Sequence, residues 1–334
     1  MDDSSIRSEM NCSTGSAGDG AAKIDLAAAG DFDPLTCPNT VCFGDNLDVL
    51  SQLPDSSIPL IYIDPPFNTG RTQTRTRLRT VRDAAGDRTG FKGQPYRTTK
   101  LGTQAYDDSF DDYLAFLEPR LLEAYRLLAP HGTLYLHLDY REVHYAKVML
   151  DGIFGRASFL NEIIWAYDFG GRSRSRWPAK HDNILVYVKS PTNYVFNSAD
   201  IDRVPYMAPG LVGPEKAARG KLPTDTWWQT IVSTNGRERT GYPTQKPLLI
   251  SRRIIQASSN PGDLVLDFFA GSGTTGGAAH ELKRRFLLVD NNLDALRVMH
   301  RRFAAYGDVR YVGYDPETDG SGEVSGRQDG EKER

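Results

Sequence analysis

The chain has 334 residues, 39% of them hydrophobic, enough to bury one large core or a main domain with a smaller attachment. It has no run of about 18 apolar residues, and its acidic start lacks the features of a secretion signal. We therefore expect a cytoplasmic protein that spans no membrane. Cys12, Cys37 and Cys42 form neither a disulfide framework nor a zinc-ligand spacing with histidine, so we expect reduced thiols and no metal.

The formal net charge of −3 conceals an uneven distribution. Residues 1–33 carry seven acidic and two basic side chains, and residues 313–334 carry seven and three. Both segments are rich in Gly and Ser and poor in large apolar residues, so we expect disordered acidic tails. The chain between them holds 35 basic and 29 acidic residues, a charge of +6, which is compatible with a nucleic-acid partner.

Patterns typical of strands and helices alternate along this central part. A strand-like segment at 40–43 precedes a short helical pattern, and the apolar run 60–63 predicts a second strand. Residues 71–100 break every periodicity. A leucine spacing from Leu114 to Leu128 then predicts a helix, and the next expected elements are strands at 133–138, 161–167 and 183–189 and a helix at about 141–151.

The region 190–243 is broken by Pro and Gly and contains Trp227 and Trp228. After it we expect a helix from Pro247 to about 258, a strand at 264–266, a helix to about 284 and a strand at 286–289. Strands that alternate with helices predict an α/β fold, a doubly wound and mostly parallel sheet covered on both faces.

Asp64-Pro65-Pro66-Phe67 follows the strand at 60–63 and places a carboxylate, a rigid turn and an aromatic ring at one point. The two prolines fix φ at about −65° and remove two backbone donors, so the turn presents carbonyl acceptors. An amino group would find only hydrogen-bond acceptors there. The alternative interpretation is an ordinary Asp-Pro turn that ends a strand.

A second motif follows the strand at 264–266. Asp267 leads into Phe268-Phe269-Ala270-Gly271-Ser272-Gly273-Thr274, and Asp290 ends the next strand. Glycines let the backbone approach a ligand, and an acid after the next strand can accept two ribose hydroxyls. The Asp267 carboxylate would repel a pyrophosphate but suits an ammonium. A nucleoside with a zwitterionic amino-acid tail describes S-adenosylmethionine.

Together these residues resemble the amino-methyltransferases that modify exocyclic nitrogens of DNA bases. Residues 64–67 resemble the catalytic D-P-P-[YF] motif, and residues 267–275 resemble the D-P-F-x-G-S-G-T-T cofactor motif, with Phe268 in place of its proline. Gly44-Asp45 resembles the G-D segment before the catalytic strand, and residues 242–247 resemble the P-T-Q-K-P stretch. The order of the motifs, over about residues 40–305, is similar to the β group of this family.

The resemblance implies a Rossmann-like methyltransferase domain at residues 34–312, which transfers methyl from S-adenosylmethionine to a base flipped out of double-stranded DNA. Asp64 and the Pro65 carbonyl would accept hydrogen bonds from the target amino group, on a turn stiffened by Pro66, and Phe67 would stack on the base. Asp45 would lie near the adenine of the cofactor, Asp290 at the ribose, Asp267 and the glycine turn at the methionine part, and Lys246 at its carboxylate. The expected cofactor residues are therefore Asp45, Thr244, Gln245, Lys246, Asp267, Phe269, Ala270, Gly271, Ser272, Gly273, Thr274 and Asp290.

Adenine N6 is the expected target, because cytosine-N4 members of the family more often carry serine where this chain has Asp64; cytosine N4 is the alternative. Transfer to a cytosine carbon would need a thiolate, and no supporting motif surrounds Cys37. Two other classes remain open, an NAD-dependent dehydrogenase built on the glycine turn and a DNA-binding protein with an inactive methyltransferase fold. Each explains one motif and leaves the other unexplained.

Basic segments next to the motifs are candidates for DNA contact. We expect a DNA-facing loop at 71–105, because it leaves directly from the Asp64 turn and holds nine Lys and Arg between 71 and 100; a solvated, disordered loop is the alternative. Residues 170–177 form a second basic stretch, either a contact or a surface turn. The expected DNA-contacting residues are Arg71, Arg75, Arg77, Arg79, Arg172, Arg174 and Arg176.

Residues of about 168–243 are the expected target-recognition region, in which at least one of Trp227 and Trp228 belongs to the core. The resemblance also suggests a homodimer and a cognate restriction enzyme as partners, with a solitary methyltransferase as the alternative.

Overall fold

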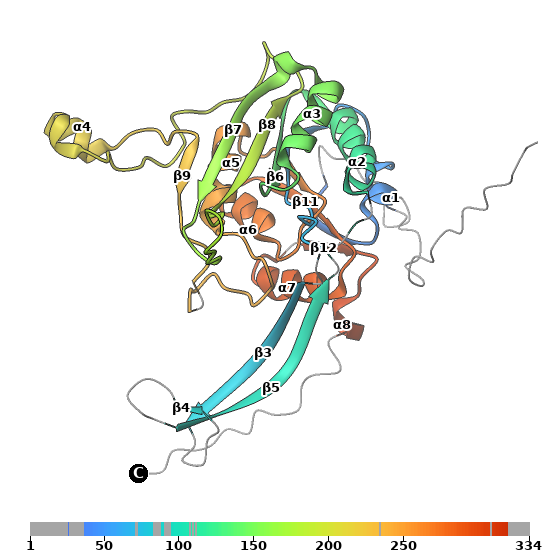
Figure 1. Cartoon of the computed structure of the whole chain (residues 1–334). Helices are drawn as coiled ribbons and strands as arrows, with labels where there is room; N and C mark the ends of the chain where they lie inside the picture. The colour runs from blue at the N-terminus through green and yellow to red at the C-terminus, as the bar shows by residue number, and fades with distance from the viewer. Residues whose placement is uncertain are drawn as a thin grey trace, which may run out of the picture.

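A nine-stranded sheet forms the centre of the molecule, in the strand order β12-β1-β11-β10-β2-β6-β8-β7-β9 (Figure 1). This computed structural model describes residues 26, 37–70, 73–82, 88–89, 95–106, 108, 110, 112–233, 235–307 and 309–319. Neighbouring strands in the sheet are parallel except at β6–β8 and β8–β7, so β8 runs against the others. The prediction of a mostly parallel α/β sheet is confirmed. The strands are β1 (Asn39–Phe43), β2 (Ile58–Ile63), β6 (Leu128–Leu138), β7 (Phe159–Ala166), β8 (His181–Val188), β9 (Thr226–Trp228), β10 (Leu264–Asp267), β11 (Arg285–Asp290) and β12 (Val309–Val312).

Helices cover both faces of this sheet, because its central strands are apolar on both sides. In β2, Ile61 and Ile63 pack into one core while Leu60 and Tyr62 pack into the other. The first core is closed by α1 (Asn46–Leu50), α2 (Tyr113–Leu127) and α3 (Val143–Phe154). The second core is closed by α5 (Leu248–Ser258), α6 (Thr274–Glu281) and α7 (Leu293–Phe303).

The neighbouring strands β2 and β10 mark the point where the chain connections diverge. From β2 the chain returns through α2 on one face, and from β10 it returns through α6 on the other. Ligands of open α/β sheets bind at the carboxyl ends of the strands at such a point. Asp64 follows β2 and Asp267 ends β10, so the fold places both acids at one edge of the sheet.

The basic segment after residue 70 differs from the expected loop. It contains β3 (Gln73–Arg82), β4 (Arg88–Thr89) and β5 (Pro95–Tyr106), which form an antiparallel sheet that projects from the body of the molecule (Figure 1). Thr alternates with Arg along much of β3, and Thr favours strands. The pattern has almost no apolar side, so hydrophobic periodicity could not reveal it.

Further elements lie in regions where we expected little regular structure. Within 190–243 the chain forms α4 (Pro214–Arg219) and β9, and α8 (Pro316–Asp319) lies in the expected C-terminal tail. The rest of that tail and all of residues 1–33 except Leu26 lie outside the described residues. Trp227 on β9 is buried whereas Trp228 is 71% exposed, which confirms that at least one of the two belongs to the core. In the described parts of the chain, helices are too short or too polar to cross a membrane.

Candidate functional site

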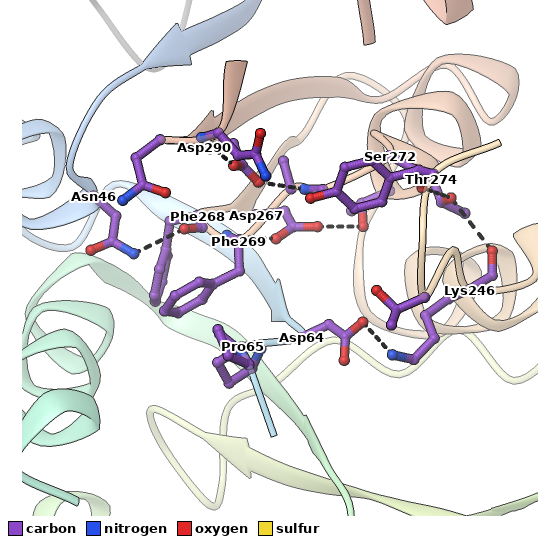
Figure 2. Close-up of a pocket in the computed structure, with 18 of the residues that line it drawn as sticks. Asn46, Asp64, Pro65, Lys246, Asp267, Phe268, Phe269, Ser272, Thr274 and Asp290 are labelled. Atoms are coloured by element: carbon purple, nitrogen blue, oxygen red, sulfur yellow. Dashed lines mark hydrogen bonds and ion pairs between the residues drawn. The ribbon is translucent and has the colours of Figure 1, made fainter. Parts of the chain in front are cut away.

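A cavity of about 620 Å³ opens at the carboxyl ends of β2 and β10. Every sequence motif described above contributes to its wall (Figure 2). Of the predicted catalytic and cofactor residues, Gly273 alone is absent from the lining. The lining includes Asp45, Asp64, Pro65, Pro66, Phe67, Thr244, Gln245, Lys246, Asp267, Phe269, Ala270, Gly271, Ser272, Thr274 and Asp290.

Asp108 holds the turn that carries Asp64 in place. Its carboxylate accepts hydrogen bonds from the Asn68 backbone N–H at 2.7 Å and from the Thr69 hydroxyl at 2.5 Å. Its carbonyl accepts one from the Gly70 backbone at 3.0 Å. These bonds tie together the two ends of the β3–β5 hairpin directly beside the catalytic turn. Nothing in the local sequence indicated this role for Asp108.

The carboxylate of Asp64 has one paired and one unpaired oxygen. Oδ2 accepts a hydrogen bond from Lys246 Nζ at 2.5 Å, whereas Oδ1 is buried and has no hydrogen-bond partner among the described residues. A buried carboxylate oxygen without a donor costs free energy. Phe67 lies beside this pair, with its ring centroid 4.6 Å from Nζ. The cavity therefore offers an acceptor next to an aromatic plate, as predicted for a base pocket.

A buried polar chain extends from Asp64 into the sheet. His137 on β6 lies with Nδ1 3.0 Å from the Tyr62 hydroxyl and 4.0 Å from Asp64 Oδ1. Its Nε2 lies 3.3 Å from the carboxylate of Asp182 on β8, which also accepts a hydrogen bond from Tyr167. Burial acts to raise the pKa of Asp182, but His137 and nearby Lys246 outweigh it, so the pKa lies below its ordinary value. Ionised Asp182 can only accept, so His137 carries a proton on Nε2.

Replacing Asp182 with asparagine is expected to destabilise the protein by about 1–3 kcal/mol at neutral pH, because the buried imidazole loses its charged acceptor. The lowered pKa of Asp182 means that its ionised form stabilises the fold above about pH 4, and that this contribution is lost as pH falls through the folded value. Urea unfolding at several pH values should therefore show a difference between parent and variant that shrinks in acid.

Tyr167→Phe is the matched control, since it removes only the second hydrogen bond to Asp182. A difference between the parent and Asp182→Asn that stays constant down to about pH 3 would contradict the assignment of an ionised Asp182.

On the cofactor side, two acids face the cavity from adjacent strands. Asp267 accepts hydrogen bonds from the Phe269 backbone at 3.0 Å and from the Thr275 hydroxyl at 2.6 Å. Burial raises its pKa to about 7, although both hydrogen bonds act to lower it. Burial likewise raises the pKa of Asp290 to about 6, against hydrogen bonds from the backbones of Asn292 and Gly271. A cationic ligand would relieve this cost of burial.

The glycine turn between these acids needs left-handed backbone at two positions. Gly271 has φ +49° and lines the cavity, and a Cβ there would lie 3.2 Å from the ring of Tyr242. Gly273 has φ +69°, and a Cβ there would lie 2.7 Å from Met299 and 2.9 Å from Phe303. Gly273 therefore serves helix packing behind the turn, while Gly271 shapes the cavity itself.

Replacing Gly273 with alanine is expected to destabilise the protein by about 1–3 kcal/mol, because the new Cβ overlaps Met299 and Phe303 on α7 and the backbone is strained. Urea unfolding measures the effect. The matched control is Gly152→Ala in the exposed interior of α3, where nothing lies within 4 Å, and which should gain about 0.5–1 kcal/mol. A variant at Gly273 as stable as the parent would show that α7 shifts at no cost.

The predicted adenine residue, Asp45, has structural partners of its own. It caps α1 by accepting from the Leu47 backbone at 2.8 Å, and its other oxygen lies 3.4 Å from Arg120. Asn46 accepts from Arg120 and donates to the Phe268 carbonyl at 3.0 Å, across to the cofactor turn (Figure 2). Asn46 and Arg120 line the cavity, yet sequence reasoning did not single them out, since their partners lie far along the chain.

The segment that leads into α5 divides its residues between structure and site. The side-chain oxygen of Gln245 accepts from the backbone and hydroxyl of Thr240, and its nitrogen donates to the Glu238 carbonyl. Gln245 thus supports the loop. Thr244 has φ +57°, which is unfavourable for a β-branched residue. Lys246, expected at the cofactor carboxylate, instead places its ammonium on Asp64.

The predicted DNA-contacting arginines fall in two places. Arg71 lies outside the described residues, and Arg75, Arg77 and Arg79 lie on β3, for which the backbone alone is described. The other three lie in the loop between β7 and β8, at the same sheet edge as Asp64, and they are exposed: Arg172, Arg174 and Arg176. Trp177, which ends this stretch, is 96% exposed.

The cavity suits the expected cofactor and offers no thiol. Burial raises the pKa of the Cys42 thiol to about 12, and neither Cys37 nor Cys42 lines the cavity. Within the described parts of the chain, no three His, Cys, Asp or Glu side chains gather closely enough to hold a metal ion. A buried acid on β10 and a second acid on β11, joined by a glycine turn, fit a ligand with a positive charge beside a ribose.

These features define a Rossmann-like α/β enzyme with its site at the carboxyl edge of the sheet. The family model described as DNA methylase, for N6 and N4 methyltransferases, matches residues 58–301. A further match is the type II methyltransferase M.HpaI of Haemophilus parainfluenzae, 32% identical over 282 residues, which cover 84% of this chain and 76% of that protein. The chain therefore belongs to the DNA methylase family, and S-adenosylmethionine is its methyl donor.

Other relatives agree with this assignment. The DNA adenine methyltransferase YhdJ of Escherichia coli K12 is 29% identical over 79% of this chain and 82% of its own. Among solved structures, a DNA modification methylase of Thermus thermophilus in complex with S-adenosylmethionine matches with a TM-score of 0.50 and 22% identity, covering 82% of this chain and 97% of its own. The cytosine-N4-specific PvuII DNA methyltransferase matches with a TM-score of 0.51 and 16% identity, over 83% and 97%. These two structures support the fold.

Proposed function

We propose that the protein methylates the N6 amino group of adenine in double-stranded DNA, with the base flipped into the cavity beside Asp64. The unpaired Oδ1 of Asp64 carries the proposal, because it is a buried acceptor that lacks a donor next to an aromatic ring. An adenine amino group supplies that donor. The Pro65 carbonyl accepts the second amino hydrogen, and Phe67 stacks on the base.

The proposed chemistry needs no covalent enzyme intermediate. S-adenosylmethionine supplies an electrophilic methyl group. Hydrogen bonds to Asp64 and Pro65 hold the amino nitrogen so that its lone pair faces the methyl donor, and they increase its electron density. When the nitrogen gains the methyl group it loses one proton, which Asp64 is placed to accept. Asp267, Asp290 and the turn at Gly271 hold the cofactor in this scheme.

Adenine is favoured over cytosine by the carboxylate at position 64 and by the similarity to an enzyme named for adenine methylation. Cytosine N4 is the alternative, because it presents the same amino chemistry. The exposed arginines between β7 and β8 support contact with DNA phosphates. Action in the cytoplasm, a homodimer and a cognate restriction enzyme remain predictions from the sequence.

The deciding experiment is mass spectrometry of nucleosides from unmethylated duplex DNA incubated with the protein and S-adenosylmethionine. We expect N6-methyladenine. N4-methylcytosine in its place would establish the alternative target. Binding of DNA without either product would support an inactive DNA-binding protein, and binding of NAD in place of S-adenosylmethionine would support a dehydrogenase.

A further inference from the structure

The ammonium of Lys246 lies on the base side of the cavity. Nζ donates to Asp64 Oδ2 at 2.5 Å and lies 4.6 Å from the centroid of the Phe67 ring, and the side chain is 11% exposed (Figure 2). Its position can be traced to the loop before α5, in which the backbone of Thr244 takes φ +57°. Lys246 therefore belongs to the pocket of Asp64 and Phe67, away from the role that the family resemblance implied.

No second cation of the described cavity wall can replace Lys246 at this point. The other basic residue of the lining is Arg120, whose guanidinium is engaged by Asn46, by the Phe116 carbonyl and by Asp45. Asp64 thus has one flexible donor beside it, on the side of the pocket that faces Phe67.

The side chains of Asp64 and Lys246 form an acceptor and a donor side by side. An ionised carboxylate can only accept hydrogen bonds, and an ammonium can only donate them. The pairing edge of adenine carries the amino donor at N6 next to the acceptor N1, and that of cytosine carries N4 next to N3. Guanine and thymine carry a carbonyl acceptor next to a ring N–H. The protein pair thus complements adenine and cytosine and opposes guanine and thymine.

The position of Phe67 sets the plane of this contact. A base that stacks on Phe67 lies parallel to its ring, so its pairing edge points sideways within that layer. Lys246 Nζ lies beside that ring and is joined to Asp64, so a base held by Asp64 brings its neighbouring ring nitrogen toward the ammonium. The lysine has a long, unbranched side chain and can shift from Oδ2 toward this nitrogen as the base enters.

We propose that Lys246 reads the target base, by donating a hydrogen bond to the ring nitrogen next to the amino group that Asp64 holds. This inference rests on the proposed function and deepens it, since it names how the same pocket selects an amino base. It assigns Lys246 to substrate recognition and predicts that the cofactor binds without it.

The test replaces one atom of the substrate and one side chain of the protein. The target adenine in a duplex is exchanged for 1-deazaadenine, in which N1 becomes C–H and the amino group stays. We expect Lys246→Met to methylate normal DNA about 10- to 100-fold more slowly than the parent in single turnover, which is typical of a lost hydrogen bond to a charged group. The parent should lose a similar factor on the deaza substrate, beyond that shown by the variant.

The comparison across all four combinations carries the test, because the atom exchange also alters the intrinsic reactivity of the amino group. Binding of S-adenosylmethionine by Lys246→Met, measured by calorimetry, should match the parent. Lys283→Met, which removes a lysine outside the cavity lining, is the matched control and should behave as the parent in both assays.

Two results would overturn the inference alone: an equal effect of the deaza base on parent and Lys246→Met, or a loss of cofactor binding in Lys246→Met that accounts for its slower reaction. If the parent forms N4-methylcytosine, the same cycle is run with 3-deazacytosine. If the parent methylates neither base, the proposed function and the inference both fail.

Discussion

Replacement of Asp64 by alanine is expected to lower the turnover number by about 1,000-fold, the upper range for removal of one preorganised hydrogen-bonding group in an active site. The unpaired Oδ1 and the Lys246-bound Oδ2 are the acceptors that hold the target amino group, and alanine supplies neither. Duplex DNA and S-adenosylmethionine should still bind, because Asp64 belongs to the base pocket and its replacement leaves Asp267 and Asp290 intact. Single-turnover methylation together with binding measurements checks this result.

Two variants frame the result for Asp64. Asp64→Asn keeps one acceptor and places an amide N–H₂ where the second was, so its rate should fall between those of the parent and alanine. Glu118→Ala, which removes an acid from α2 outside the cavity lining, should leave the rate unchanged. A rate for Asp64→Ala within a few-fold of the parent would place the chemistry elsewhere, and loss of cofactor binding would mean that the variant disturbs the whole cavity.

The motifs at Asp64 and Asp267 were predictable because their chemistry is local. A strand followed by two prolines fixes a turn, and a strand followed by spaced glycines fixes another, whatever the rest of the chain does. The parallel sheet then brings the two turns together, since both follow strands that point to one edge. The central strands were found for the same reason, because burial on both faces leaves continuous apolar runs.

The supporting residues of the site were not predictable because their partners are brought near by tertiary structure. Asn46 bonds a carbonyl 222 residues away, and His137 meets Asp182 through the register of an antiparallel strand pair. The position of Lys246 was misjudged for a related reason: the motif identified the residue, but the direction of its side chain depends on the strained turn before it. By contrast, α7 could have been found from the spacing of Leu296, Met299 and Phe303.

Replacement of Asp267 by asparagine is expected to weaken binding of S-adenosylmethionine by about 10- to 100-fold, because a charged hydrogen-bond partner is lost at constant shape. The pKa of Asp267, raised by burial to about 7, makes this binding depend on pH. Below pH 7 the carboxyl is mostly protonated in the free protein, so a cationic ligand must displace its proton. The dissociation constant should therefore rise by about tenfold per pH unit below this pKa, and the variant should lack this dependence.

Calorimetry in buffers of different ionisation enthalpy should detect the proton released when the parent binds the cofactor at a pH of about 6, and none attributable to Asp267 in the variant. Because the folded pKa exceeds the unfolded value of about 4, the native protein binds more protons than the unfolded chain between about pH 4 and 7, so its stability falls as pH rises through this window. Asp267→Asn should flatten that decline, and Asp290, with its pKa of about 6, should account for part of what remains. Opposite slopes of stability and affinity with pH would show that the carboxylate which binds the cofactor is one that the empty fold holds at a cost; parallel slopes, or a pH-independent affinity in the parent, would contradict the role of Asp267.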